Sequence, residues 1–131
     1  MNPKYFLISD KDKELLLEIN SRLPEKIKIM TEKMLTIEYH KDKFKPFYDE
    51  LGYFQSPIIG LVRDKITNET IFTGVVAHEL AHFYQFTKYP FLYKLLRGTW
   101  ICEEWADRIA IKWGFKKEIS NVRHYLNQNT S

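Results

Sequence analysis

Residues 68–86 read NETIFTGVVAHELAHFYQF, and the rest of the chain is best understood by working outward from them. Asn68 suits a helix N-terminus, because its side-chain oxygen can accept a hydrogen bond from an unpaired backbone N–H of the first turn. From Ile71 to Phe86 there is neither a proline nor the alternation of a strand. The sequence therefore predicts a long helix over residues 71–86.

This helix contains His78-Glu79-Leu80-Ala81-His82, an H-E-x-x-H pattern. Side chains four residues apart lie about 5–6 Å from each other on one face of a helix, so both imidazoles can bind one ion while Glu79 flanks it. Zinc suits such a site, and a catalytic zinc has three protein ligands and a water. A third ligand is therefore needed. The alternative is that both histidines are simply packed on an apolar helix.

The third ligand is expected in Glu103-Glu104-Trp105-Ala106-Asp107, on a helix predicted over Trp100–Trp113 between the cap residue Thr99 and Gly114. At 100° per residue, Glu103 lies beside the small side chains of Ala106 and Ala110, which let another helix come close. Glu104 falls beside Arg108 instead. We therefore select Glu103 as the ligand and expect Glu104 to form a solvated ion pair.

Asp107 lies one helical turn beyond Glu103. Its carboxylate can accept the free ring N–H of a metal-binding histidine, most simply His78, and so fix the tautomer of that ring. Two acids at the start of a helix can instead stabilise the helix dipole. That alternative accounts for Glu103 and Glu104 but leaves Asp107 unexplained.

The order H-E-x-x-H and then E-x-x-A-D resembles the signature of the gluzincin metallopeptidases. It is similar to the catalytic core of the CAAX prenyl protease and HtpX-type families, in which the second motif also continues as A-D-R, here Ala106-Asp107-Arg108. Those relatives carry transmembrane helices. In length this chain is closer to the minigluzincins, which are soluble single-domain relatives. The motif-bearing resemblance covers residues 71–115, and over residues 1–70 it is one of element order only.

The resemblance implies one zinc ion and a peptidase site between a sheet edge and the two motif helices. It also implies, as in some minigluzincins, a C-terminal segment that can occupy the site in a latent form. With His78, His82 and Glu103 as ligands, Glu79 is the expected general base and acid in peptide hydrolysis. If Ile58–Val62 is an edge strand, an extended substrate can pair with its backbone.

Gluzincins usually stabilise the developing oxyanion with a histidine or tyrosine downstream of the glutamate helix, and His124 and Tyr125 are the candidates here. The prenyl-protease relatives have a proline near that histidine, and this segment has none. A surface position for His124 is an equal alternative. The same segment can instead cover the site as an inhibitory tail.

The remaining residues predict an α+β single domain over residues 1–131, and the resemblance implies that its fold is zincin-like. Residues 1–70 are expected to form a helix plus a sheet, residues 71–115 the zinc-binding helices, and residues 116–131 a C-terminal helix or tail. The expected elements are a backing helix over 10–22, three strands over 27–29, 35–39 and 58–62, an aromatic loop over 40–55, a short helix over 91–96 and a last helix over 119–126.

Composition limits the alternatives. The chain has 20 Lys and Arg against 17 Asp and Glu, spread along its length, so nucleic acid is not an expected partner. No apolar run approaches the ~20 residues of a membrane span. Cys102 is the single cysteine and is expected to be a small core residue, and His40 a solvated one. We expect a cytoplasmic protein that is a monomer or small homo-oligomer.

The sequence thus predicts a zinc-dependent endopeptidase, a hydrolase acting on a peptide or protein substrate. One alternative is a non-catalytic module that uses zinc as a structural clip and binds peptides or a partner. A structural zinc site is closed by four protein ligands, so a fourth ligand from Cys102 or His124 would favour it. Another is a regulatory protease with a dedicated partner. A DNA-bound protease of the SprT type is disfavoured, because its third ligand is a histidine.

Overall fold

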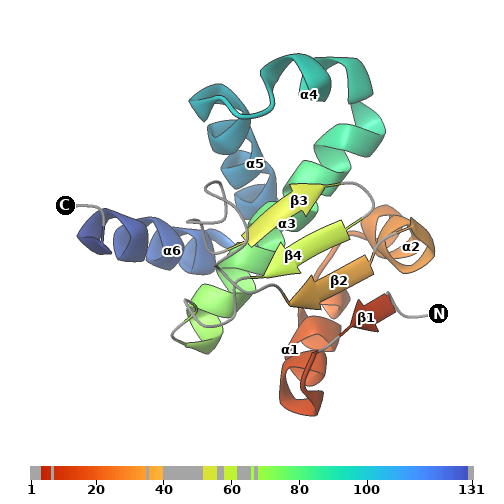
Figure 1. Ribbon diagram of the computed structural model, residues 1–131, viewed down its shortest axis with the longest axis vertical. Coiled ribbons are helices and arrows are strands. Elements are labelled where there is room, and N and C mark those ends of the chain that lie inside the picture. Colours follow the sequence, from red (N-terminus) through yellow and green to blue (C-terminus); the bar gives the residue numbers. More distant parts are fainter. Residues whose placement is uncertain are drawn as a thin grey trace.

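Four strands form one mixed sheet in the order β1-β2-β4-β3, seen face-on in Figure 1. The computed structural model describes residues 4–6, 8–34, 36–39, 52–55, 58–61, 66 and 68–129. β2 is parallel to both β1 and β4, and β3 is antiparallel to β4. The strands are β1 (Lys4–Phe6), β2 (Thr36–Tyr39), β3 (Gly52–Gln55) and β4 (Ile58–Leu61).

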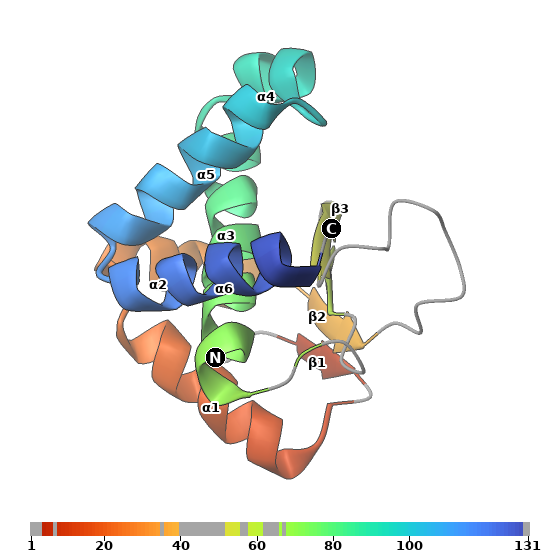
Figure 2. The ribbon, with the colours of Figure 1, turned by 90° about the vertical axis from the view of Figure 1, so that its left-hand side faces the viewer.

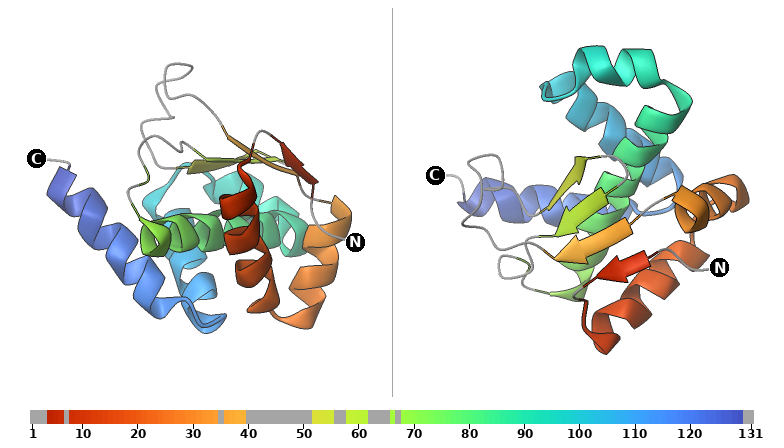
Figure 3. Two further views of the ribbon diagram at one scale, coloured as in Figure 1. Left: turned by 90° about the horizontal axis from the view of Figure 1, so that it is seen from below. Right: turned by 45° about the vertical axis from the view of Figure 1, so that its right-hand side comes forward.

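The described helices lie on one side of this sheet, as Figures 2 and 3 show. α3 runs beneath the strands and packs against β3, β4, α1, α4, α5 and α6. The arrangement is that of an α+β protein, the predicted class. The helices are α1 (Asp10–Ser21), α2 (Glu25–Met34), α3 (Glu69–Lys88), α4 (Pro90–Leu96), α5 (Trp100–Lys112) and α6 (Lys116–Asn129).

α3 is the central element of the core. Phe72, Leu80 and Phe83 are among its fully buried side chains, and Ile59 of β4 is equally buried above it. A helix that is apolar on all sides is normally surrounded by protein. Yet α3 also buries polar side chains, which must find partners within the protein because burying them alone is costly. Those polar residues are His78, Glu79, His82 and Gln85.

The predicted helix caps are confirmed. Asn68 Oδ1 accepts a hydrogen bond of 2.9 Å from the backbone N–H of Ile71 at the start of α3. Thr99 Oγ1 accepts one of 3.3 Å from the N–H of Cys102 at the start of α5. Gly114 follows α5 with a φ of +104°, a left-handed conformation that glycine adopts without strain. α1, α4 and α6 also lie where helices were predicted, although α6 is longer at both ends.

The predicted strand over residues 27–29 is wrong, because these residues lie in α2. The carbonyl of Pro24 accepts hydrogen bonds from the N–H groups of Ile27 and Lys28 at the start of the helix. Ile27 and Thr31, four residues apart, are both buried, whereas Ile29 is 44% exposed. Three residues of alternation fit a helix as well as a strand, and the buried face follows the helical period.

The sheet edge also differs from the prediction. β4 pairs with β2 on one side and with β3 on the other, so Ile58–Leu61 is not an edge strand. Among the described strands the edge on this side is β3, which lies within the segment predicted as a loop. β1 at the opposite edge was not identified from the sequence. The rest of the predicted loop, His40 included, lies outside the described residues.

In the part of the chain that the structure describes, no helix combines the length and the apolar character needed to cross a membrane.

Candidate metal centre

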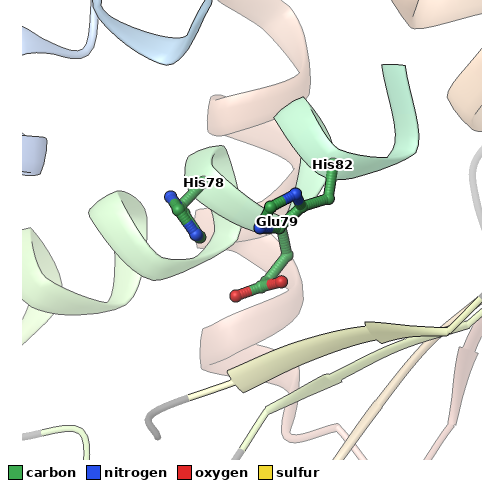
Figure 4. A group of neighbouring side chains, drawn as sticks. All are labelled: His78, Glu79 and His82. Carbon is green, nitrogen blue, oxygen red and sulfur yellow. The ribbon is translucent and has the colours of Figure 1, made fainter. Parts of the chain in front are cut away.

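Two buried turns of α3 carry the H-E-x-x-H residues, and Figure 4 shows the Glu79 carboxylate directed towards the strands. His78 and His82 are each 6% exposed and Glu79 is 4% exposed. The imidazole centroids are 4.6 Å apart. One ligand atom of each of the three residues lies within 4.8 Å of the others, an arrangement that can hold a metal ion.

α5 places Glu103 against both imidazoles. Glu103 Oε2 is 2.7 Å from His82 Nε2, and Oε1 is 3.2 Å from His78 Nε2. Ligand atoms around a tetrahedral zinc with bonds of ~2.1 Å are about 3.4 Å apart. The 3.2 Å separation is close to that value, whereas the 2.7 Å separation is that of a direct charge-assisted hydrogen bond. Glu104 points elsewhere and pairs with Arg108 at 2.7 Å, with both side chains exposed. The structure thus brings Glu103 to the histidines and leaves Glu104 outside.

His78 is oriented by Asp107, as the sequence suggested. Asp107 Oδ1 is 2.7 Å from Nδ1 of His78. Arg123 of α6 donates to both carboxylate oxygens of Asp107, from Nε at 2.6 Å and from Nη2 at 2.8 Å. Burial favours the neutral carboxyl, but the hydrogen bonds from His78 and Arg123 outweigh it and lower the pKa of Asp107. The ionised carboxylate therefore accepts a hydrogen bond from Nδ1–H of His78, and this orientation directs Nε2 to Glu103.

His82 is oriented by Gln85, which the sequence analysis did not identify. Gln85 Oε1 is 2.7 Å from His82 Nδ1, and Gln85 Nε2 donates to the carbonyl of Cys102 at 3.2 Å. The side chain is fully buried between α3 and α5. The signal in the sequence that could have identified Gln85 is an amide side chain one turn after a motif histidine, in an otherwise apolar stretch. Both rings are thus held at Nδ1, and both present Nε2 to one carboxylate.

The electrostatics of the centre suit a cation. Burial alone would lower the pKa of His78, but its hydrogen bonds to Asp107 and Glu103 outweigh burial and raise that pKa. At His82, burial is outweighed by the contacts with Cys102 and Glu103, and the pKa is raised well above its ordinary value. The same imidazoles outweigh burial at Glu103 and hold its pKa far below its usual range. A divalent cation can supply the positive charge that this environment favours.

Cys102 is fully buried and lies behind the ring of His82. Its Sγ is 3.9 Å from His82 Nδ1 and 3.4 Å from Gln85 Oε1. The two nitrogens of an imidazole point away from each other, so this sulfur is not on the Nε2 side where Glu103 approaches. One ligand atom each of His82, Cys102 and Glu103 also lies within 4.8 Å of the others. Cys102 is nevertheless on the Nδ1 side of His82, so it does not join the ligand atoms around Nε2.

Among the described residues of α6, Arg123 is joined to the metal centre by hydrogen bonds to Asp107. The sequence had suggested His124 or Tyr125 instead. His124 is exposed, and no hydrogen bond or ion pair joins it to the described residues. Tyr125 is partly buried and packs against the core. α6 lies close to α3 because Gly74 has no side chain there: a Cβ would be 2.5 Å from Val122 Cγ2 and 2.6 Å from the carbonyl oxygen of Glu118. This contact positions α6, and with it Arg123.

α4 adds an aromatic side chain on the other side of the centre. The ring of Tyr93 is 6.0 Å from that of His82 and 6.1 Å from that of Phe54 on β3. Burial raises the pKa of the Tyr93 phenol to about 12, with Cys102 and Glu79 adding to the effect. Tyr93 is therefore a protonated hydrogen-bond donor at neutral pH. Glu103 is 34% exposed, so the centre is in contact with solvent on its α5 side.

Comparison of this chain with protein-family models, curated proteins and solved structures finds no match. Two imidazole nitrogens and a carboxylate converge from two helices, and each imidazole is held from behind by an oxygen acceptor. Two overlapping groups, His78 with Glu79 and His82, and His82 with Cys102 and Glu103, each have ligand atoms within 4.8 Å of one another and could hold a metal ion.

Proposed function

We propose that this protein is a zinc-dependent endopeptidase with a zincin-like fold and the ligand set His78, His82 and Glu103. The observation that supports this most directly is the contact of both Nε2 atoms with the Glu103 carboxylate, at 2.7 Å and 3.2 Å. Nitrogen and oxygen ligands suit zinc, and three protein ligands are typical of its catalytic sites. Asp107 and Gln85 act behind the histidines and hold the ring orientations.

A zinc ion bound there would supply Lewis acidity, which lowers the pKa of water to ~7 and polarises a peptide carbonyl. Glu79 follows His78 on α3 and is 4% exposed. Its carboxylate takes a proton from the attacking water and returns it to the departing amine. Glu79 therefore acts on the proton, while the two histidines and Glu103 keep the reacting groups in place.

Tyr93 is the proposed donor to the developing oxyanion, a role for which the sequence suggested His124 or Tyr125. Its phenol remains protonated at neutral pH, and its ring lies beside that of His82. Hydrogen-bond donors placed at the developing charge are among the strongest contributors to acyl-transfer catalysis. His124 is exposed and Tyr125 packs in the core, so neither is assigned this role.

The substrate is proposed to bind in extended form along β3. β3 packs against α3, and its Phe54 contacts Phe83 of α3 and Tyr93 of α4, with ring centroids 5.9 Å and 6.1 Å apart. The backbone of an edge strand can pair with a peptide and orient it without selecting particular side chains. A regulatory protease would share this chemistry and differ only in having a dedicated partner.

The test is the Glu79→Gln variant, compared with Glu104→Gln as a matched control. Both substitutions replace an acid by its amide, but Glu104 is an exposed partner of Arg108. We expect Glu79→Gln to retain about one zinc per chain and to lose hydrolysis of an unfolded protein substrate, by roughly 100-fold or more. Glu104→Gln should behave like the parent chain. A zinc-loaded protein whose hydrolysis survives Glu79→Gln, or that hydrolyses nothing before substitution, would contradict the proposal.

A further inference from the structure

A group of apolar side chains at the junction of α4 and α5 is exposed to solvent. Phe91 and Leu95 of α4 are 86% and 72% exposed, and Trp100 at the start of α5 is 72% exposed. We call these three residues the α4–α5 tip. Leu92 and Ile101 beside them are 43% and 45% exposed. Large apolar side chains gathered in this way indicate an interaction surface, whereas single exposed ones are ordinary.

The tip lies at one end of the molecule. In Figures 1 and 2, α4 forms the upper end, beyond the sheet and away from α1 and α2. The other face of α4 is directed inward, because Tyr93 packs against Phe54 and Phe86 with ring centroids 6.1 Å and 5.9 Å apart. The inward face of α4 therefore lies beside the metal centre, where Tyr93 contacts His82. The outward face is exposed and available to a partner.

The segment that carries the tip is also positively charged. Residues 80–102 contain no Asp or Glu, although the chain has 17 of them. The same segment carries Lys88, Lys94 and Arg97, all exposed. None of these three cations forms an ion pair within the described part of the chain. On α4, Lys94 and Leu95 follow Phe91 by three and four residues, so an ammonium group and two apolar side chains share one face.

We propose that the α4–α5 tip docks on the surface of an anionic lipid bilayer. A projecting end can reach a flat surface, and the apolar side chains of the tip can enter the headgroup region. The cations beside the tip can then meet anionic lipids. Tryptophan is favoured at that depth. A second copy of this chain is a poorer occupant, because a symmetric contact would bring the same cations face to face. Lysine is also depleted in the cores of protein interfaces.

The test is co-sedimentation of the protein with vesicles of phosphatidylcholine, with and without phosphatidylglycerol. We expect binding only when the anionic lipid is present, and weakening as salt increases. Each cation contributes roughly five-fold to the partition coefficient, so replacing Lys88, Lys94 and Arg97 together with Gln should weaken binding about 100-fold. Binding that is equal for neutral and anionic vesicles, or no binding to either, would overturn the proposal.

A second set of variants identifies the binding face. Replacing Phe91 and Leu95 with Ser should abolish binding to the anionic vesicles. The matched control replaces Leu17 and Ile29 with Ser and should leave that binding unchanged. Those two residues are 41% and 44% exposed, on α1 and α2. Circular dichroism and thermal unfolding check that each variant is folded. If the Phe91 and Leu95 double variant still binds vesicles, the assignment is refuted. It is also refuted if the parent protein self-associates in sedimentation velocity and the double variant does not.

Trp100 supplies a measurement on the unaltered tip, which does not depend on the folding of the serine variants. With brominated phosphatidylcholine in the anionic vesicles, tryptophan emission should be quenched, and Trp100→Phe should remove most of the quenching while binding persists. Trp105 and Trp113 are only partly exposed and supply the background. Quenching that is unchanged in Trp100→Phe would place the lipid contact elsewhere and overturn the proposal. This inference does not depend on the peptidase proposal.

Discussion

Replacing Glu103 with Gln is expected to weaken zinc binding by two to three orders of magnitude. Its two carboxylate oxygens contact both imidazoles, at 2.7 Å and 3.2 Å, and a neutral amide keeps the shape while removing the charge. Structural zinc with four ligands binds with about 10–16 kcal/mol, so one ligand is worth roughly 2.5–4 kcal/mol. Since 1.4 kcal/mol is a factor of ten, the dissociation constant should rise about 100- to 1,000-fold.

Competition with a chromophoric zinc chelator measures this change, and thermal unfolding at a fixed free zinc concentration provides a second readout through linkage. Glu104→Gln is the control, because it removes only an exposed ion pair worth ~0–1 kcal/mol. Its zinc dissociation constant should stay within about twofold of the parent value. If Glu104→Gln weakened zinc binding as much as Glu103→Gln, or if neither did, the assignment of Glu103 as the third ligand would be refuted.

Asp107→Asn removes the charge that orients His78 and should weaken zinc binding about 10- to 100-fold without loss of fold, as titration with the same chelator would show. Tyr93→Phe should lower kcat about 10- to 100-fold with little change in KM; a raised KM with unchanged kcat would instead argue for a role in substrate binding. Gly74→Ala should lower the free energy of unfolding by about 1–3 kcal/mol in urea, because the new methyl group meets backbone of α6. pH should act in opposite directions on the two forms. A raised histidine pKa stabilises the metal-free fold below pH 6.5 and loses that effect as pH rises through the folded-state value. Zinc affinity rises over the same interval, because the imidazole ligands must be neutral to bind the metal; a zinc affinity independent of pH there would contradict this.

Several features of the centre were predictable because they are local. The spacing of His78 and His82 places both on one helical face wherever the helix lies. Asn68 and Thr99 begin their helices through contacts within a single turn, and both caps are observed. The selection of Glu103 over Glu104 follows from the 100° step of a helix and needs only the assumption that α5 faces α3.

Other features depend on contacts between distant parts of the chain, and the sequence does not show them. A short apolar alternation at Ile27 is compatible with strand and helix, and only its packing distinguishes them. Strand order is another example, because pairing of β4 on both sides depends on where β2 and β3 dock. Arg123 reaches Asp107 only because α6 crosses α3 at Gly74. Spacing along one helix thus determines which side chains can face a metal together. Which residues orient those side chains depends on how the helices pack, because a side chain contacts only what lies near its own backbone.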